Sequence, residues 1–153
     1  MKKIALLVLV MALAVAGSSF AQAKADFSGK WAPKVDANAA PPAGGGGRGG
    51  MGGGPMTVKQ TATELTQERT MGETTMTTVF KLDGTESVNK TQRGESKSTA
   101  KFDGGKLVVK TVSEGANGPQ EATATWSLSG DGKELTILNV TARGERTTVY
   151  TKQ

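Results

Sequence analysis

Apolar and polar residues alternate with a period of two through most of the chain after Thr57. In the segment EATATWSLS, one face carries Ala122, Ala124, Trp126 and Leu128, and the other face carries threonines and serines. This alternation is typical of a strand with one buried face. TTMTTVFKL, ELTILNVTA and ERTTVYTKQ are similar, and no window shows the apolar stripe of an amphipathic helix. Threonine supplies 20 of the last 97 residues and favours strands, so we expect an all-β protein.

Short turn signals separate these runs. Asp-Gly pairs occur at residues 83–84, 103–104 and 131–132, and Asp-Gly supplies the positive φ angles of tight hairpin turns. Calcium loops are the functional alternative, but one Asp per turn does not supply the roughly six to eight converging oxygens that calcium takes. The runs and turns together predict strands at residues 28–32, 56–61, 64–69, 73–82, 86–92, 95–102, 106–113, 120–129, 134–142 and 145–152.

The spacing of the strands also predicts their topology. Connections this short permit only antiparallel neighbours, which makes the strands a meander. An open meander leaves two unpaired edges. Closure into a barrel removes them, and a curled open sheet is the alternative. We expect an antiparallel meander of about 8–10 strands, closed or nearly closed into a barrel whose first and last strands meet.

The first 23 residues have the features of an export signal. Two lysines precede an apolar run at residues 4–16, and Ala21-Gln22-Ala23 is a small-residue cleavage site. The run is too short to cross the hydrocarbon core of about 30 Å, although an uncleaved anchor is the alternative. We expect residues 1–23 to be removed, or else cleavage after Ala25, and the mature protein to be periplasmic or secreted. The chain has no Cys, which excludes a lipid anchor at the cleavage point and disulfides.

Charge and missing residue types narrow the chemistry. Loss of Lys2 and Lys3 leaves 17 of the 19 basic residues against 14 acidic ones, a net charge of +3 that does not indicate a polyanion partner. His and Cys are both absent, which removes the usual general base, nucleophile pairs and metal ligands. The glutamates lie mostly at strand edges and turns, and no pair stands out for glycoside hydrolysis. We therefore expect no enzyme activity, no cofactor and no metal site.

The mature chain opens with DFSGKW, which resembles the G-x-W signature of lipocalins. DFSGKW, the Gly-rich insert, KLDGTE, KFDGGKL, WSLSGDGKELT and a closing VYTKQ together resemble small exported bacterial proteins described as lipocalin-like. The resemblance implies a calycin-type barrel with Gly29 and Trp31 at its closed end. It also implies a basic side chain from near the last strand packed across the Trp ring as a cation–π contact. Arg143 and Arg146 are the candidates, and Arg146 is preferred. The family implies no activity, and the chain lacks the cysteines and C-terminal helix of many lipocalins.

The stretch PPAGGGGRGGMGGGPM interrupts the chain after the first strand. It holds nine glycines and one arginine, Arg48, which is too little charge to hold a nucleic acid. No phosphate-binding glycine motif followed by a helix is present. We expect residues 24–153 to form one domain in which residues 37–55 are a disordered Gly/Pro-rich loop. A lid over the barrel mouth is the alternative.

Two functions remain open. The first is a non-catalytic, lipocalin-like module that binds a small apolar or amphipathic molecule. Alternation selects Met76, Phe80, Phe102, Val109 and Trp126 as the lining of its cup. The alternative is a structural or interaction protein of the cell envelope, in which the same rings fill the barrel and no ligand binds. We expect no nucleic-acid partner and no membrane span after cleavage. Protein partners are not indicated.

Overall fold

The computed structural model describes residues 24–34, 54–91, 94–115 and 118–153. Within these ranges the chain forms a single antiparallel sheet and no helix. Its ten strands match the predicted strands within three residues at each end. The predicted signal segment and residues 37–53 of the predicted loop lie outside the described residues. The strands are β1 (Gly29–Pro33), β2 (Met56–Gln60), β3 (Glu64–Met71), β4 (Thr74–Lys81), β5 (Asp83–Thr91), β6 (Gly94–Asp103), β7 (Lys106–Gly115), β8 (Gly118–Leu128), β9 (Glu134–Thr141) and β10 (Gly144–Lys152).

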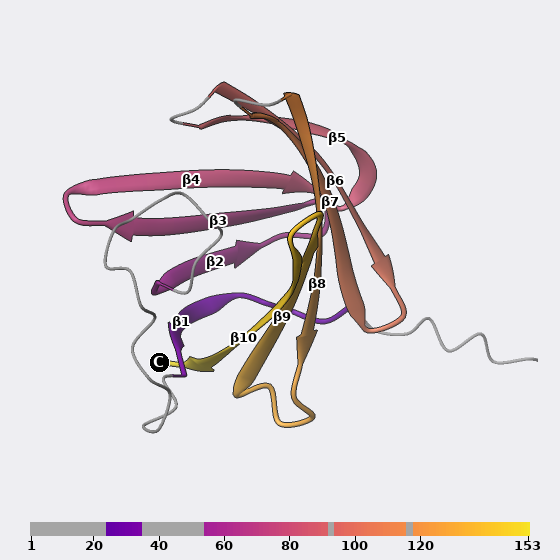
Figure 1. Cartoon of the computed structure of the whole chain (residues 1–153). Coiled ribbons are helices and arrows are strands. Elements are labelled where there is room, and N and C mark those ends of the chain that lie inside the picture. The colour runs from indigo at the N-terminus through magenta and orange to yellow at the C-terminus, as the bar shows by residue number, and fades with distance from the viewer. Residues whose placement is uncertain (1–23, 35–53, 92–93, 116–117) are drawn as a thin grey trace, which may run out of the picture.

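The first and last strands meet, as the meander predicts. The strand order is β4-β3-β2-β1-β10-β9-β8-β7-β6-β5, so β1 lies between β2 and β10. Trp31 lies opposite Lys152 and Pro33 lies opposite Tyr150. The backbone N–H of Lys34 donates to the carbonyl of Val149 at 2.8 Å and prolongs this pairing. Figure 1 shows the C-terminus beside β1. We call the β1–β10 pairing the closing ladder.

The barrel is interrupted between β4 and β5, the two ends of the strand order. Only Leu82 separates these strands in the chain, yet they form no ladder, so the hairpin predicted at Asp83-Gly84 is wrong. The segment turns a corner instead. Asp83 accepts hydrogen bonds from the backbone N–H and the hydroxyl of Thr85, at 2.9 and 2.6 Å. Gly84 has a φ of 85°, and the β5–β6 register shifts between Asp83 and Glu86. The barrel is therefore nearly closed rather than closed.

Side chains of β5 bridge this β4–β5 seam. The Asn89 amide oxygen accepts from the backbone N–H of Val79 at 2.8 Å, and the Asn89 amide nitrogen donates to the Val79 carbonyl at 2.9 Å. The Ser87 hydroxyl accepts from the backbone N–H of Lys81 at 2.8 Å. Asn89 and Ser87 are both buried. Their polar groups thus bond to backbone groups of β4 that have no ladder partner on this side.

Aromatic rings fill one end of the barrel. Phe27, just before β1, is fully buried and stacks on Phe102 with ring centroids 6.3 Å apart. Its edge meets Trp126 at 5.8 Å, and Phe80 meets the other side of this cluster at 6.5 Å from Trp126. Gln60 holds the segment before β1 in place, because its side-chain oxygen accepts a hydrogen bond from the Phe27 N–H at 3.0 Å. The residues before β1 therefore plug this end of the barrel.

The cation that lies over Trp31 is Lys152, not Arg146. The Lys152 ammonium lies 5.4 Å from the Trp31 ring centroid, and Trp31 donates its indole N–H to the Phe27 carbonyl at 2.9 Å. Register explains the error, because Lys152 is the residue opposite Trp31 whereas Arg146 is exposed and lies opposite Asn139. Gly29 makes room for the lysine stem. A Cβ at Gly29 would lie 2.6 Å from Lys152 Cε, and the backbone φ of 144° also favours glycine.

Candidate functional site

Four of the five residues predicted to line a cup belong to or pack against one core cluster, and only Met76 lies outside it. Phe80 and Trp126 are buried in the ring cluster, and Phe102 packs against the same core. Val109 is buried farther along β7, opposite Ala124. Met76 stands apart on β4, half-buried and opposite Arg69 of β3. Four of the five therefore belong to the packed core, and the other inward-facing side chains are the candidates for a site.

The remaining interior is lined by small and polar side chains. Ser98 and Thr111 lie opposite each other on β6 and β7, both buried, with their hydroxyl oxygens 2.9 Å apart. Ala100 and Ala124 are the buried positions next to them along β6 and in the neighbouring strand β8. The barrel thus has two unlike halves, one filled by rings and one lined by hydroxyl, amide and methyl groups.

A polar cluster around one cation lies on the inward-facing side of β3 and β10. Arg69 of β3 donates from Nη2 to the Tyr150 hydroxyl at 3.3 Å, and its guanidinium carbon lies 5.9 Å from the Tyr150 ring centroid. Gln67, with its amide oxygen turned toward the guanidinium, accepts from Arg69 Nη2 and Nε at 3.0 and 3.1 Å. Tyr150 and Gln67 are buried, and Arg69 is half-buried. The cluster combines a planar cation, a phenol and an amide on the inner face of the barrel.

The sequence contains a signal for this cluster that our prediction did not use. Leu65, Gln67 and Arg69 are in phase on β3, and Leu65 is fully buried. Every second residue of a strand points to the same face, so Arg69 shares the face of Leu65. We expected charged residues in strands to lie on the solvent face, and Arg69 was therefore not predicted to be an interior residue. Tyr150 was counted only as a core ring.

Two further polar atoms of the interior have no hydrogen-bond partner among the described residues. They are Oδ1 of Asn139 on β9 and Oγ1 of Thr148 on β10, and both atoms are shut off from solvent. Asn139 is in phase with buried Leu135 and Ile137, and Thr148 is in phase with buried Tyr150. Buried polar atoms normally have hydrogen-bond partners, and the described residues supply none for these two atoms.

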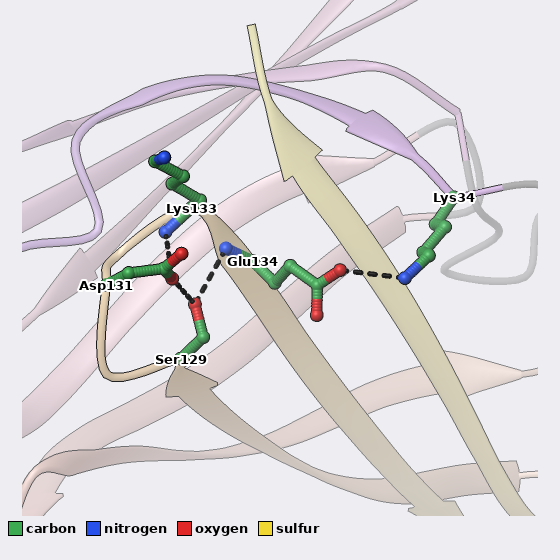
Figure 2. A network of polar contacts seen from close by, with 5 residues as sticks. All are labelled: Lys34, Ser129, Asp131, Lys133 and Glu134. Carbon is green, nitrogen blue, oxygen red and sulfur yellow. Dashed lines mark hydrogen bonds and ion pairs between the residues drawn. The ribbon is translucent and has the colours of Figure 1, made fainter.

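A hollow on the outer surface surrounds the β8–β9 turn, and its polar groups bond to one another. The Ser129 hydroxyl donates to Asp131 at 2.5 Å and accepts from the Glu134 N–H at 2.9 Å. The Lys133 N–H donates to Asp131 at 3.1 Å, and Lys34 forms an ion pair with Glu134 at 2.8 Å. Figure 2 shows this network on the turn. The polar groups around the hollow therefore stabilise the β8–β9 turn, and we do not take the hollow as the candidate site.

The carboxyl groups with shifted pKa values also serve local structure. The pKa of Asp26 is lowered first by its hydrogen bond with the Ser28 side chain, then by that with the Ser28 backbone. Hydrogen bonds with Thr85 and Ser129 lower the pKa values of Asp83 and Asp131, respectively. These groups stay ionised at neutral pH, unlike a general acid. Among the residues that the structure describes, no three carboxylates gather into a possible metal site.

Comparisons with known proteins identify the class of fold. No family model matches the sequence, and no curated protein matches it. The structure is similar to a protein described as REP1-NXSQ fatty acid transporter, with a TM-score of 0.59 and 15% identity over 83% of this chain and 96% of that chain. It is also similar to secretory abundant heat soluble protein 4 from Ramazzottius varieornatus, with a TM-score of 0.58 and 21% identity over 83% of this chain and 94% of that one. These likenesses show the fold, which is consistent with a lipocalin-like barrel.

Proposed function

We propose that this barrel is an exported, non-catalytic module that binds a small amphipathic molecule with an acidic head group, such as a fatty acid. The observation that carries the proposal is the cluster of Arg69, Tyr150 and Gln67 on the inner wall. The acidic head would join this cluster, and the alkyl part would lie against the small apolar side chains of the opposite wall.

The chemistry of the cluster favours a carboxylate. A guanidinium presents a planar fork of donors that matches the two oxygens of a carboxylate, and such charge-assisted bonds are stronger than neutral ones. Arg69 donates to the Tyr150 hydroxyl, which leaves the hydroxyl hydrogen to donate in turn to a ligand oxygen. Ligand pockets commonly combine an apolar lining with a few polar groups placed in this way.

Two other observations support parts of the proposal. One structural neighbour is described as a fatty acid transporter, which makes fatty acids the first class to test. The export signal at residues 1–23 supports a periplasmic or secreted location. Within the described part of the chain, no helix is long and apolar enough to cross a membrane.

The filled end of the barrel favours a second candidate. Phe27, Leu65, Leu107 and Leu135 have no exposed surface, and they belong to the same core cluster as Phe80 and Trp126. A structural or interaction protein of the cell envelope needs no cup and would have such a core. Under this alternative Arg69 and Tyr150 hold β3 near β10 and do nothing else.

Binding to matched variants separates the two candidates. Laurate and oleate titrated into the protein, followed by calorimetry and Trp fluorescence, should bind with an Arg69-dependent affinity. Loss of a hydrogen bond to a charged group costs about 1.5–3 kcal/mol, so Arg69→Met should weaken binding by roughly 10- to 150-fold. Arg143→Met is the control, because Arg143 is exposed near the β9–β10 turn. Absence of binding to either acid, or equal affinities for all three proteins, would exclude the proposed site.

A further inference from the structure

The interior holds a second polar position besides the Arg69 cluster. Asn139 and Thr148 lie on neighbouring strands β9 and β10, where Thr148 is opposite Ile137 and Asn139 is opposite Arg146. They are therefore diagonal neighbours on one face, and such positions lie about 7–8 Å apart in antiparallel sheets. A single group placed between them can contact both side chains.

The two orphaned atoms define what that group must be. Asn139 Oδ1 is an acceptor and needs a donor, whereas the Thr148 hydroxyl can donate or accept. A hydroxyl group can donate to the first atom and accept from the second at the same time. A methylene group can do neither, and a carboxylate cannot donate to Asn139.

The position is also continuous with the proposed head-group site. Thr148 and Tyr150 are successive inward residues of β10, which places them roughly 7 Å apart along the strand. On the neighbouring strand β8, buried Ala124 lies opposite Asn139. The Ala124 methyl group provides an apolar surface beside the Asn139 side chain. A ligand chain that starts at Arg69 and Tyr150 would pass the two orphaned atoms.

We infer that Asn139 and Thr148 form a subsite for a hydroxyl group, so that the barrel prefers hydroxylated fatty acids to plain ones. This inference rests on the proposed function of the Arg69 cluster. It assigns that site a narrower ligand class, an amphipath with an acidic head and an alcohol on its chain. A site built to bond a hydroxyl discriminates against the analogue without one, because its buried polar groups are then left unpaired.

The test compares laurate with laurates that carry one hydroxyl near the carboxylate, in mid-chain or at the end. At least one hydroxylaurate should bind the protein about tenfold tighter than laurate in calorimetric titrations. In Thr148→Val with Asn139→Leu this preference should disappear. Laurate binding with no preference, or a preference that survives in the double variant, would overturn the inference and leave the proposed function standing. Failure of every acid to bind would overturn both.

Stability gives an independent readout with a matched control. An orphaned hydroxyl destabilises the empty barrel, so Thr148→Val should raise the Tm by roughly 2–5 °C. Thr111 is also a buried interior threonine, but its hydroxyl is paired with Ser98. Thr111→Val should therefore lower the Tm. A Tm that falls as much in Thr148→Val as in Thr111→Val would show that Thr148 serves the fold, which would contradict the subsite.

Discussion

The barrel is joined along two lines that are built from different parts of the chain. In the closing ladder, β1 and β10 pair through their backbones, and the Lys34 and Gln153 N–H groups add bonds at its two ends. Across the β4–β5 seam, by contrast, Asn89 and Ser87 supply the bonds to β4 from their side chains. Backbone pairing tolerates most residue types. A bridge made of side chains depends on which residues supply them, so a single substitution at Asn89 or Ser87 can open the wall locally at the seam.

The largest effect is expected on the closing ladder. Trp31 is 1% exposed, packs under Lys152 and donates to Phe27, so Trp31→Ala removes a large buried side chain at this ladder. We expect the free energy of unfolding to fall by about 3–5 kcal/mol, measured by urea denaturation with circular dichroism. Val88→Ala, at an exposed position of β5, is the control and should change it by less than roughly 0.5 kcal/mol. A similar result for both variants would contradict the importance of the Trp31 position.

A smaller and more local effect is expected at the seam. Asn89→Leu leaves the N–H and carbonyl of Val79 without their amide partner, at a cost of about 1–3 kcal/mol. Hydrogen exchange at the Val79 N–H should become faster, while exchange at the Lys34 N–H, which donates to the Val149 carbonyl at the closing ladder, should change less. Asn89→Asp keeps an acceptor for the Val79 N–H but sets a carboxylate oxygen against the Val79 carbonyl, so it should not restore the bridge. Unchanged exchange at Val79 would show that Asn89 does not hold the seam.

The smallest effect is expected just before the closing ladder, and it depends on pH. The Asp26 carboxylate accepts from the Ser28 N–H at 2.9 Å, and its pKa lies below its ordinary value of 3.8. A lowered pKa in the folded state means that the ionised group stabilises the fold above pH 3.8, and that this stabilisation is lost as pH falls through the folded pKa. Asp26→Asn should therefore lower the Tm slightly at pH 7 and by less at pH 2. An equal Tm difference at both pH values would exclude this origin.

Alternation and turn residues were sufficient to predict the strands and their meander, because faces and turns are local properties of the chain. Register is not local. The Trp31 ring was expected to meet Arg146, yet the pairing of β1 with β10 brings Lys152 across it. The same limit explains Asp83-Gly84, whose composition is that of a hairpin turn. Whether the two flanking strands then pair depends on the path of β5 along β6, which residues 83–84 do not determine.

The candidate site was harder to predict than the fold. Ring residues such as Phe80 and Trp126 were chosen because large apolar side chains suit both a cup and a core, and the structure places them in the core cluster. Arg69 and Asn139 were not chosen, because a polar residue in a strand is usually solvated. Their phase relative to buried Leu65 and Ile137 identifies them as interior residues. The phase of a residue identifies it as interior only when the buried face of its strand is known.

The pairing of β1 with β10 also orders events during synthesis. A ribosome completes β1 more than a hundred residues before it completes β10, so the emerging sheet must wait with the edges of β1 and β9 uncovered. Contacts between such distant segments form slowly and leave nascent chains open to aggregation. A barrel that cannot close early stays unfolded for longer during synthesis, which is compatible with the proposed export of the chain before it folds.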